Sequence, residues 1–493
     1  MAVEDEQNKE QLINYVFGKL AEAPQFVENQ LKVKGSYLPH RRVYSRLKMH
    51  VDDFLLGEGM GGKISNRLII LPGLRGVGKT TLLFQLYKYL KEVKKIEQDR
   101  ILYFSTDELK AYLGRGILEV IDVFIKEIHK TTFTSLDKEI FIFIDESHFD
   151  PKWSEAAKII FDKTKKIFLI FTGSSALNLE LSVDAARRTK KEIVFPLNFG
   201  EYISLRHNVY PPKGMAEGIR ELIFKGDDAA VENAQRKEAE LNRNLVKVGR
   251  PIDKEWEDFL CCIGFPIGLQ MSQIEVHERL FSMIDRVIEK DVFSIQAFST
   301  DTRNVISRIL TFLALQKPGG TSDAKLSDRL KISPNTVRNI LEVLEKTHLI
   351  FSVKPYGGAG KVVRKPWKYY FLSSSIIAAI RFKLGAYNPR DREMLGVLAE
   401  NMAASYFFRM KETVNLPVGM FYDSEPNGAD FLLQDAEENI IPLEIGIGKK
   451  DKSQVRNSIN RYKSKYGIVV SNVQKITKQD NVIFIPLTTF SFV

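Results

Sequence analysis

The chain has 493 residues, of which 44% are hydrophobic and 27% are charged, with a net charge of +10. This length exceeds one ordinary hydrophobic core and predicts roughly two to four domains. No apolar run approaches the roughly 20 residues that span a bilayer, and the polar residues 1–11 lack the pattern of a signal peptide, so we expect a cytoplasmic protein.

The two cysteines, Cys261 and Cys262, are neighbours in the sequence. Adjacent cysteines rarely bridge each other, and two thiols cannot complete a metal cage. We therefore interpret them as core thiols in a reducing compartment.

The N-terminal half alternates short apolar runs with helical segments. Residues 1–41 are expected to form an amphipathic helix and a polar loop. Purely apolar runs are typical of parallel strands that are covered on both faces, and their spacing predicts an α/β domain with a parallel sheet over residues 42–210. The runs are Leu68–Leu71, Ile101–Phe104, Ile140–Ile144, Ile167–Phe171 and Ile193–Phe195. Residues 211–302 are expected to be helical, with the highly charged part, 211–250, exposed as a helix or an insertion.

A P-loop follows the first of these runs. The sequence GLRGVGKT occupies 73–80, between an apolar strand and a segment of helical periodicity, which is the context that this motif requires. Its glycines allow backbone N–H groups to surround phosphate oxygens, and the helix N-terminus adds positive potential. Lys79 is expected to reach the β- and γ-phosphates and Thr80 to bind Mg²⁺. The predicted ATP ligands in this segment are Gly73, Gly76, Val77, Gly78, Lys79, Thr80 and Thr81.

Polar side chains end two later strands. Asp145 and Glu146 follow a buried run, where a carboxylate of a P-loop enzyme holds the magnesium shell and a neighbouring glutamate activates water. We assign these roles to Asp145 and Glu146, respectively. Thr172 ends the next run and is predicted to sense the nucleotide, although a plain Thr-Gly-Ser turn explains it equally well.

An arginine pair, Arg187–Arg188, lies between the last two runs. An arginine beyond the sensor strand can stabilise transition-state charge, in cis or across a subunit interface, so Arg188 joins Glu146 and Lys79 as a predicted catalytic residue. Action in trans requires a homo-oligomer. A solvated basic patch with Lys190 and Lys191 is the alternative.

Several segments together resemble a known family. They are GLRGVGKTT, FIFIDE, FTGSS, ARRTKKEIVFPLNFGEY and CCIGFPIGL. This pattern is similar to prokaryotic AAA-type ATPases that carry a C-terminal domain of nuclease-like fold. Asn198 stands where the family usually has serine, and Cys262-Ile263 replaces part of a glycine element. The resemblance implies an ATPase core with a helical lid.

A winged helix is predicted over residues 303–372. Residues 324–330 and 336–346 have the periodicity and the capped turn of a helix-turn-helix, and 351–372 read as two strands around a glycine-rich tip. The tip region carries Lys354, Lys361, Arg364, Lys365 and Lys368 with interleaved aromatics. Residues 335–370 are therefore predicted to contact duplex DNA. Packing of the module against the nucleotide domain is the alternative.

The C-terminal residues 373–493 resemble the PD-(D/E)xK nuclease-like domain that follows such ATPases. The resemblance implies a metal-binding site made by Glu400, Asp430 and Glu444. Gly446 stands where the family has its lysine, so we expect the nuclease activity to be lost. A basic stretch, 449–465, is a second candidate DNA contact or a solvated helix face.

Three hypotheses follow for function. The first is an ATP- and Mg²⁺-dependent AAA-type ATPase that is associated with DNA and uses its nucleotide state as a switch. The second is an ATP-gated, metal-dependent nuclease of a defence system. The third is a signalling ATPase whose partner is a protein.

Overall fold

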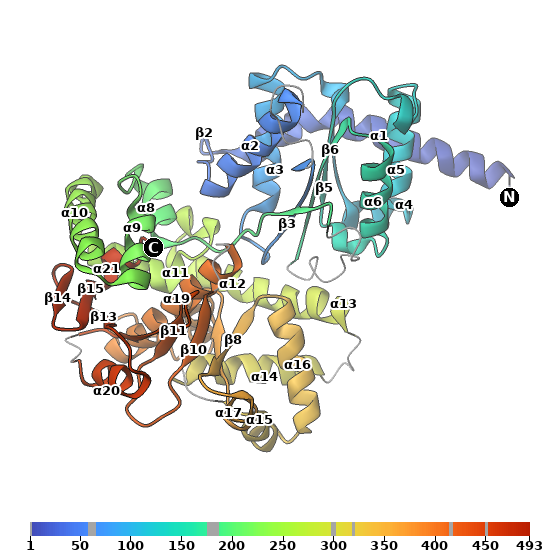
Figure 1. Ribbon diagram of the computed structural model, residues 1–493. Coiled ribbons are helices and arrows are strands. Elements are labelled where there is room, and N and C mark those ends of the chain that lie inside the picture. Colours follow the sequence, from blue (N-terminus) through green and yellow to red (C-terminus); the bar gives the residue numbers. More distant parts are fainter. Residues whose placement is uncertain are drawn as a thin grey trace. The chain divides into compact units, whose positions relative to one another are not determined.

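The computed structural model describes residues 2–57, 66–174, 187–296, 302–317, 321–413, 418–448 and 452–493. The chain divides into two compact units, Met1–Val194 and Phe195–Val493 (Figure 1). The boundary therefore lies after Val194, whereas the sequence pattern predicted that the first α/β domain ends at residue 210. Helix α8 (Phe199–His207) belongs to the second unit because the Phe199 ring packs 5.5 Å from Phe259 and 5.3 Å from Phe492.

The first unit is an α/β domain whose helices and strands alternate along the chain. Its helices are α1 Ala2–Leu31, α2 Arg42–Leu56, α3 Lys79–Lys88, α4 Thr106–Leu113, α5 Ile117–Val123 and α6 Trp153–Lys163. Its strands are β1 Lys32–Val33, β2 Ser36–Tyr37, β3 Leu68–Pro72, β4 Ile101–Ser105, β5 Ile140–Asp145, β6 Ile167–Gly173 and β7 Lys190–Lys191. The predicted N-terminal helix is present, and the polar loop after it contains the short hairpin β1–β2.

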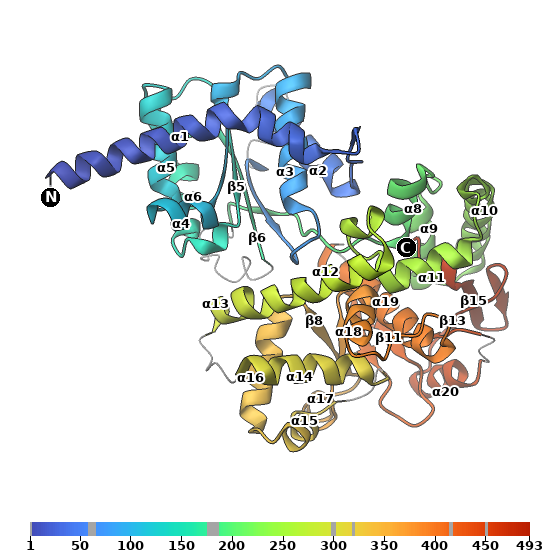
Figure 2. The same ribbon diagram turned by 180° about the vertical axis from the view of Figure 1, so that it is seen from behind.

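Among the described residues, five parallel strands form one sheet in the order β4-β5-β6-β3-β7. Helices α5 and α6 cover one face and α2 and α3 the other, while α1 packs against helices of both layers (Figures 1 and 2). Because both faces are covered, β3, β5 and β6 are buried along their whole length, which explains their purely apolar sequences.

Four of the five predicted strands are confirmed, and the position of the fifth is wrong. Strand β7 is Lys190–Lys191 rather than 193–195, and its residues pair with Ile69 and Ile70. Val194 still donates its backbone N–H to Pro72 O at 2.9 Å. The apolar run at 193–195 marks the buried exit from this edge strand and not the strand itself.

The second unit is built from helices followed by a mixed sheet. Its helices are α8 Phe199–His207, α9 Met215–Lys225, α10 Asp228–Leu245, α11 Ile252–Cys262, α12 Gln273–Arg286, α13 Phe293–Ile295, α14 Thr302–Leu315, α15 Asp323–Leu330, α16 Pro334–Lys346, α17 Ala359–Arg364, α18 Ser374–Lys383, α19 Arg392–Thr413, α20 Ser453–Tyr462 and α21 Leu487–Phe490. Its strands are β8 Ile350–Pro355, β9 Lys368–Phe371, β10 Gly419–Tyr422, β11 Phe431–Gln434, β12 Ile440–Ile445, β13 Gly467–Ser471, β14 Thr477–Gln479 and β15 Val482–Pro486.

The region predicted as a winged helix shares its sheet with the C-terminal region. Helices α15 and α16 occupy the predicted helix-turn-helix, and Ser333 caps α16 by accepting the N–H of Thr336 at 3.1 Å. Strands β8 and β9 pair antiparallel, with α17 inserted in the tip between them. Strand β8 also pairs parallel with β10, so the described strands form one eight-stranded sheet, β14-β15-β13-β12-β11-β10-β8-β9. No sheet boundary therefore separates residues 303–372 from 373–493.

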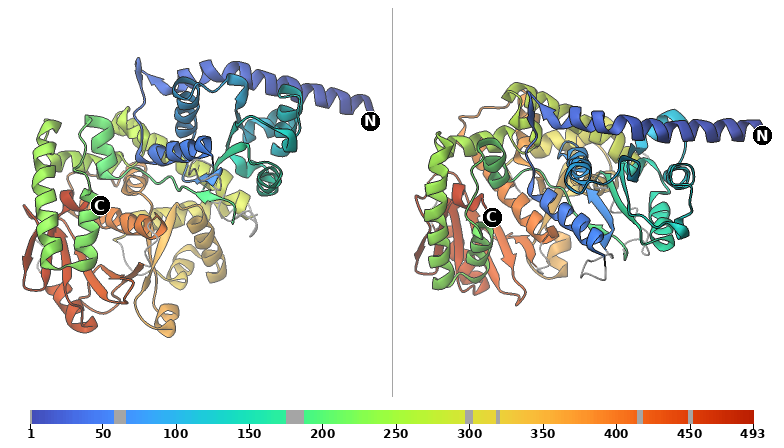
Figure 3. Two further views of the ribbon diagram at one scale, coloured as in Figure 1. Left: turned by 45° about the horizontal axis from the view of Figure 1, so that its top comes forward. Right: turned by 90° about the horizontal axis from the view of Figure 1, so that it is seen from above.

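Residues 211–250, expected to be exposed as a helix or an insertion, form helices α9 and α10, but these are not fully exposed. They lie beside the strands at the β14 end of the sheet (Figure 3). Glu238 of α10 is only 3% exposed, and it accepts hydrogen bonds from Ile476 N at 2.8 Å and from Thr489 Oγ1 at 2.7 Å. Helix α10 therefore has one buried face despite its highly charged sequence.

The predicted core thiols lie beside a buried histidine. Cys261 and Cys262 are free and buried, and the Cys262 Sγ lies 3.6 Å from His277 Nε2. The imidazole also stacks on Phe382, with ring centroids 4.8 Å apart. Burial lowers the pKa of His277 to about 4 and raises the pKa of both thiols, so all three groups are neutral near pH 7.

This histidine predicts a loss of stability in acid. Because the unfolded chain titrates His277 near pH 6.5, it binds more protons than the folded chain between pH 6.5 and pH 4. The folded state is therefore most stable above pH 6.5, where His277 is neutral in both states. On going from pH 6.5 to pH 5, the free energy of unfolding should fall by about 2 kcal/mol. Urea unfolding at both pH values measures this change. The His277→Gln variant should show a smaller pH dependence, and an unchanged dependence would contradict the assignment.

No helix among the described residues combines the length and the apolar sequence needed to cross a bilayer.

Candidate functional site

The predicted nucleotide-binding residues meet at one edge of the first sheet. Strand β6 lies between β3 and β5, so the carboxyl ends of these three strands are neighbours. The pairing of Leu71 with Thr172 and of Ile144 with Phe171 sets the loop after β3, Thr172 and Asp145 side by side. Ligands of open α/β sheets bind at this edge, where loops and helix N-termini converge.

The loop between β3 and α3 has the conformation that its glycines permit. Gly76 and Gly78 have φ of 79° and 93°, which L side chains rarely adopt. A Cβ on Gly73 would lie 2.4 Å from Val194 O, so this position accepts no side chain. Lys79 is 5% exposed, and its Nζ donates to Gly73 O at 2.9 Å and to Leu74 O at 3.2 Å. Two carbonyl groups of the P-loop thus hold the Lys79 ammonium close to the loop.

Asp145 is the centre of a buried hydrogen-bond network. Thr80 Oγ1 donates to Asp145 Oδ2 at 2.6 Å, and Thr172 Oγ1 donates to Asp145 Oδ1. Tyr103 Oη contacts the same carboxylate at 3.4 Å. Burial, followed by the neighbouring Glu146 charge, raises the pKa of Asp145, and the two threonine hydroxyls and Lys79 oppose this shift. The hydroxyls of Thr80 and Thr172, which the sequence indicated separately, therefore share the carboxylate of Asp145.

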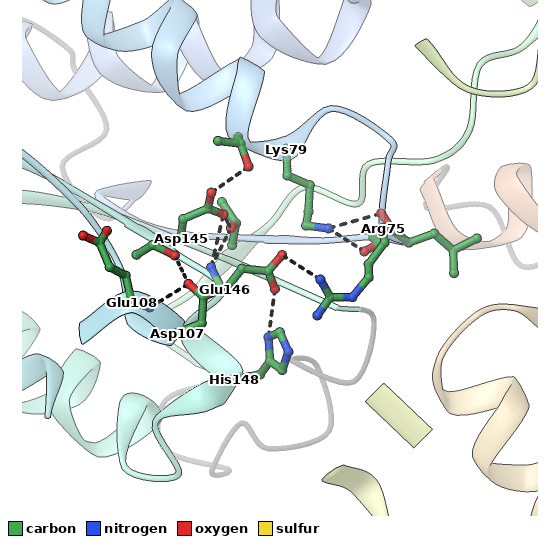
Figure 4. Close-up of polar contacts among 12 residues, drawn as sticks. Arg75, Lys79, Asp107, Glu108, Asp145, Glu146 and His148 are labelled. Atoms are coloured by element: carbon green, nitrogen blue, oxygen red, sulfur yellow. Dashed lines mark hydrogen bonds and ion pairs between the residues drawn. The ribbon is translucent and has the colours of Figure 1, made fainter. Parts of the chain in front are cut away.

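Glu146 follows Asp145 in a left-handed conformation, with φ of 50°. This turn directs its side chain away from the sheet and toward the P-loop (Figure 4). Its Oε1 lies 3.8 Å from an Arg75 nitrogen, and its Oε2 lies 3.4 Å from His148 Nδ1. The carboxylate is thus held between a residue of the P-loop and the first turn after β5.

Four further residues of the site were not predicted from the sequence: Arg41, Arg75, Tyr103 and His148. Arg41 is 7% exposed and donates from an NH1 group to Val77 O at 2.6 Å, so it braces the P-loop from the start of α2. Arg75 lies within the motif itself, and its charge was the one sequence feature that indicated a role. The others act through contacts between segments distant in sequence.

These residues fit a nucleotide with Mg²⁺. The hydroxyl of Ser174, at the end of β6, is buried and has no hydrogen-bond partner in the part of the chain that the structure describes. An unpaired buried hydroxyl is unfavourable, and an oxygen-rich ligand would pair it. The Thr80 hydroxyl and the Asp145 carboxylate offer the oxygen ligands that Mg²⁺ prefers.

The structure does not bring Arg188 to this site. Its guanidinium pairs with Asp162, from Nε to Oδ1 at 2.8 Å and from NH2 to Oδ2 at 3.2 Å. Asp162 lies in the last turn of α6, the helix that precedes β6, and Arg188 lies two residues before β7 starts. Both therefore lie at the amino ends of the parallel strands, opposite the P-loop. The sequence left action in cis or in trans open, and the catalytic role of Arg188 stays a prediction.

A family model described as an AAA domain matches residues 65–203. A protein of Methanocaldococcus jannaschii, uncharacterized protein MJ1637, is 31% identical over 480 residues, which cover 97% of this chain and 94% of that relative. The chain belongs to the AAA-type P-loop ATPase family. A second family model, described as a domain of unknown function, matches residues 253–387 of this AAA-type ATPase, from α11 to the turn after α18.

More distant proteins are also similar to this AAA-type ATPase. An uncharacterized protein of Haemophilus influenzae is 23% identical over 314 residues, which cover 62% of this chain and 66% of that protein. A solved structure, the Walker-type ATPase of Pyrococcus abyssi, has a TM-score of 0.41 at 14% identity and covers 71% of this chain and 97% of its own.

In the second unit of this AAA-type ATPase, the structure brings Glu400, Asp430 and Glu444 together. Asp430 directly precedes β11, and its backbone N–H donates to Glu444 Oε2 at 3.2 Å. Burial, followed by the charge of Asp430, raises the pKa of Glu400 in α19 to about 7. Among the described residues, however, no group of three His, Cys, Asp or Glu is placed to hold a metal ion. The metal implied by the nuclease resemblance does not fit this cluster.

Several residues predicted to contact DNA are instead buried or form ion pairs within the chain. Lys361 pairs with Glu425 at 2.9 Å, and Tyr370 is 1% exposed. In the second stretch, Arg461 pairs with Asp423 at 2.5 Å, and Arg456 pairs with Asp480 at 2.8 Å. The exposed basic residues of these stretches include Arg338, Lys354, Arg364, Lys365, Lys463 and Lys465. Lys449 and Lys450 lie outside the described residues.

Proposed function

We propose that this chain is an ATP-hydrolysing switch whose nucleotide state controls contact between its second unit and duplex DNA. The network that joins Thr80, Asp145 and Thr172 beside Lys79 carries the ATPase part of this proposal. It combines a cation for phosphate, oxygen ligands for Mg²⁺ and a carboxylate for water in one place.

The residues act in distinct ways in this proposal. Backbone N–H groups of residues 76–81 and the Lys79 ammonium bind the phosphates, and Mg²⁺ neutralises their charge when it is bound through Thr80 and Asp145. Glu146 accepts a proton from the attacking water. Arg75 and His148 position the Glu146 carboxylate, since both lie within 4 Å of it. Arg188 serves only a neighbouring copy of the chain, which would make the active form an oligomer.

Nucleotide binding and switching can be linked through Glu146. Its contact with Arg75 at 3.8 Å joins the strand end to the P-loop. A phosphate beside Arg75 would compete for the guanidinium and release the glutamate toward water. The difference in contacts between the two states is what permits a ligand to shift a conformational equilibrium.

The DNA part of the proposal depends on the exposed face around α16 and α17. Replacing Arg364 and Lys365 by glutamate should weaken binding of a fluorescent DNA duplex at least tenfold at low salt. It should also reduce the slope of log affinity against log salt by about two, because two phosphate contacts are lost. Fluorescence anisotropy at several salt concentrations measures both quantities.

The matched control for this test is Arg243→Glu with Lys247→Glu on the exposed face of α10 and the turn after it. It changes net charge equally and should leave DNA affinity within about threefold. Equal effects of the two double variants on DNA affinity would show that binding depends on net charge and not on this face. Absence of DNA binding by the parent chain at low salt, or no effect of a non-hydrolysable ATP analogue on affinity, would contradict the switch.

A protein-binding ATPase is the second candidate function. The ion pairs of Lys361, Lys368 and Arg461 with carboxylates of the same chain favour it, because each pair neutralises a cation that was expected to contact DNA. A pull-down with this chain, performed with and without nuclease treatment, tests this function. Recovery of the same partner protein in both cases, together with no DNA binding by the chain, would favour it over the first.

A further inference from the structure

The lysine that the carboxylate cluster lacks at Gly446 has a counterpart on a different strand. Lys368 of β9 is only 13% exposed, and its Nζ lies 3.6 Å from Glu400 Oε1. The same nitrogen lies 5.2 Å from the centre of the Tyr422 ring. This residue was predicted to contact DNA from the wing, and the structure instead directs its ammonium into the C-terminal domain.

One oxygen of each carboxylate in the cluster already accepts a hydrogen bond from a donor of the chain. Tyr370 Oη donates to Glu400 Oε1 at 2.8 Å, and the N–H of Ile445 donates to Asp430 Oδ2 at 2.9 Å. Glu444 Oε2 accepts the N–H of Asp430. A divalent cation requires several such oxygens to turn toward one point, and here one oxygen of each carboxylate turns toward a backbone N–H group, a phenol or an ammonium.

We propose that Lys368 is the permanent internal cation of this cluster, and that its ammonium occupies the role that a divalent metal has in the nuclease-like site. Three carboxylates held close together, with Glu444 fully buried, would repel one another. One fixed ammonium beside Glu400 offsets part of that repulsion without any bound ion.

This ion pair also connects two regions of the second unit. Lys368 and Tyr370 come from the strand pair that follows the helix-turn-helix, whereas Glu400 comes from α19. Next to it, Asn401 donates to Phe371 O and accepts from Phe371 N, both at 2.9 Å. The cluster thus fixes β9 to the C-terminal layer, so the helix-turn-helix and the C-terminal strands should move as one body.

A metal titration of the nucleotide-free full-length chain tests the proposal. The parent chain should show no Mn²⁺ binding that Asp430→Asn removes. Lys368→Met should be less thermally stable and should gain a Mn²⁺ site that disappears when Asp430→Asn or Glu400→Gln is added. Lys368→Arg keeps the positive charge and should gain no site. A Mn²⁺ site in the parent chain that depends on Asp430, or a Lys368→Met variant with unchanged stability and no new site, would overturn the proposal.

A second measurement applies even if Lys368→Met does not fold. Acetylation by a small reagent, followed by mass spectrometry, should modify Lys368 at least tenfold more slowly than the exposed Lys365 of the same chain. Glu400→Gln should narrow this difference, because the ammonium loses its partner. Equal modification of the two lysines in the parent chain would place Lys368 in solvent and contradict the internal role.

Discussion

Replacing Lys79 by alanine is expected to weaken ATP binding about 100-fold and to abolish measurable hydrolysis. The Lys79 ammonium is 5% exposed and is held over the P-loop by Gly73 O and Leu74 O, where it is desolvated before any ligand arrives. Charge-assisted hydrogen bonds to phosphate oxygens contribute about 1.5–3 kcal/mol each, and the loss of about 3 kcal/mol corresponds to the stated factor.

Binding of a fluorescent ATP analogue and release of phosphate measure the two effects. Lys91→Ala is the matched control, because it removes the same side chain from the turn that continues α3, where Lys91 contacts Gln98. The control should retain affinity and turnover within about twofold. A folded Lys79→Ala variant that binds ATP as tightly as the parent chain would show that the nucleotide binds elsewhere.

The sequence was sufficient for the ATPase sheet because each of its signals is local. An apolar run that is covered on both faces, a glycine loop and the following helix are all contained in a few consecutive residues. Asp145 and Thr172 could be placed beside the loop because parallel strands present their carboxyl ends at one edge. The strand at 193–195 was misplaced because burial of an exiting segment produces the same apolar pattern as a strand.

Contacts between residues far apart in the chain could not be predicted from local sequence patterns. Nothing near Arg188 indicates that Asp162, 26 residues earlier, takes its guanidinium to the opposite edge of the sheet. Lys368 lies in a basic, aromatic stretch that is typical of a DNA-binding wing, and its partner Glu400 comes from another element. Strand β8 joined the C-terminal sheet through β10 for the same reason, since pairing between strands depends on the three-dimensional path of the chain.

Replacing Glu146 by glutamine is expected to reduce ATP turnover about 100- to 1,000-fold and to leave ATP affinity within about threefold. Glutamine has nearly the same shape as glutamate but cannot accept a proton from water, and general base catalysis contributes about 10²–10⁴ in rate. The bound nucleotide should therefore remain a triphosphate. Separation of the nucleotide extracted from the protein after incubation, together with steady-state phosphate release, measures both quantities.

Asp107→Asn is the matched control for this prediction. This substitution also removes one carboxylate charge at the same edge of the sheet, since Asp107 lies in the first turn of α4. Asp107 is exposed, and among the described contacts it accepts hydrogen bonds only from Ser105 and Glu108 (Figure 4). It should retain turnover within about twofold. If Glu146→Gln also turned over ATP at that rate, Glu146 would not be the base, and its contacts with Arg75 and His148 would be structural. A loss of turnover in Glu146→Gln alone, with ATP retained, identifies the carboxylate between Arg75 and His148 as the group that activates water.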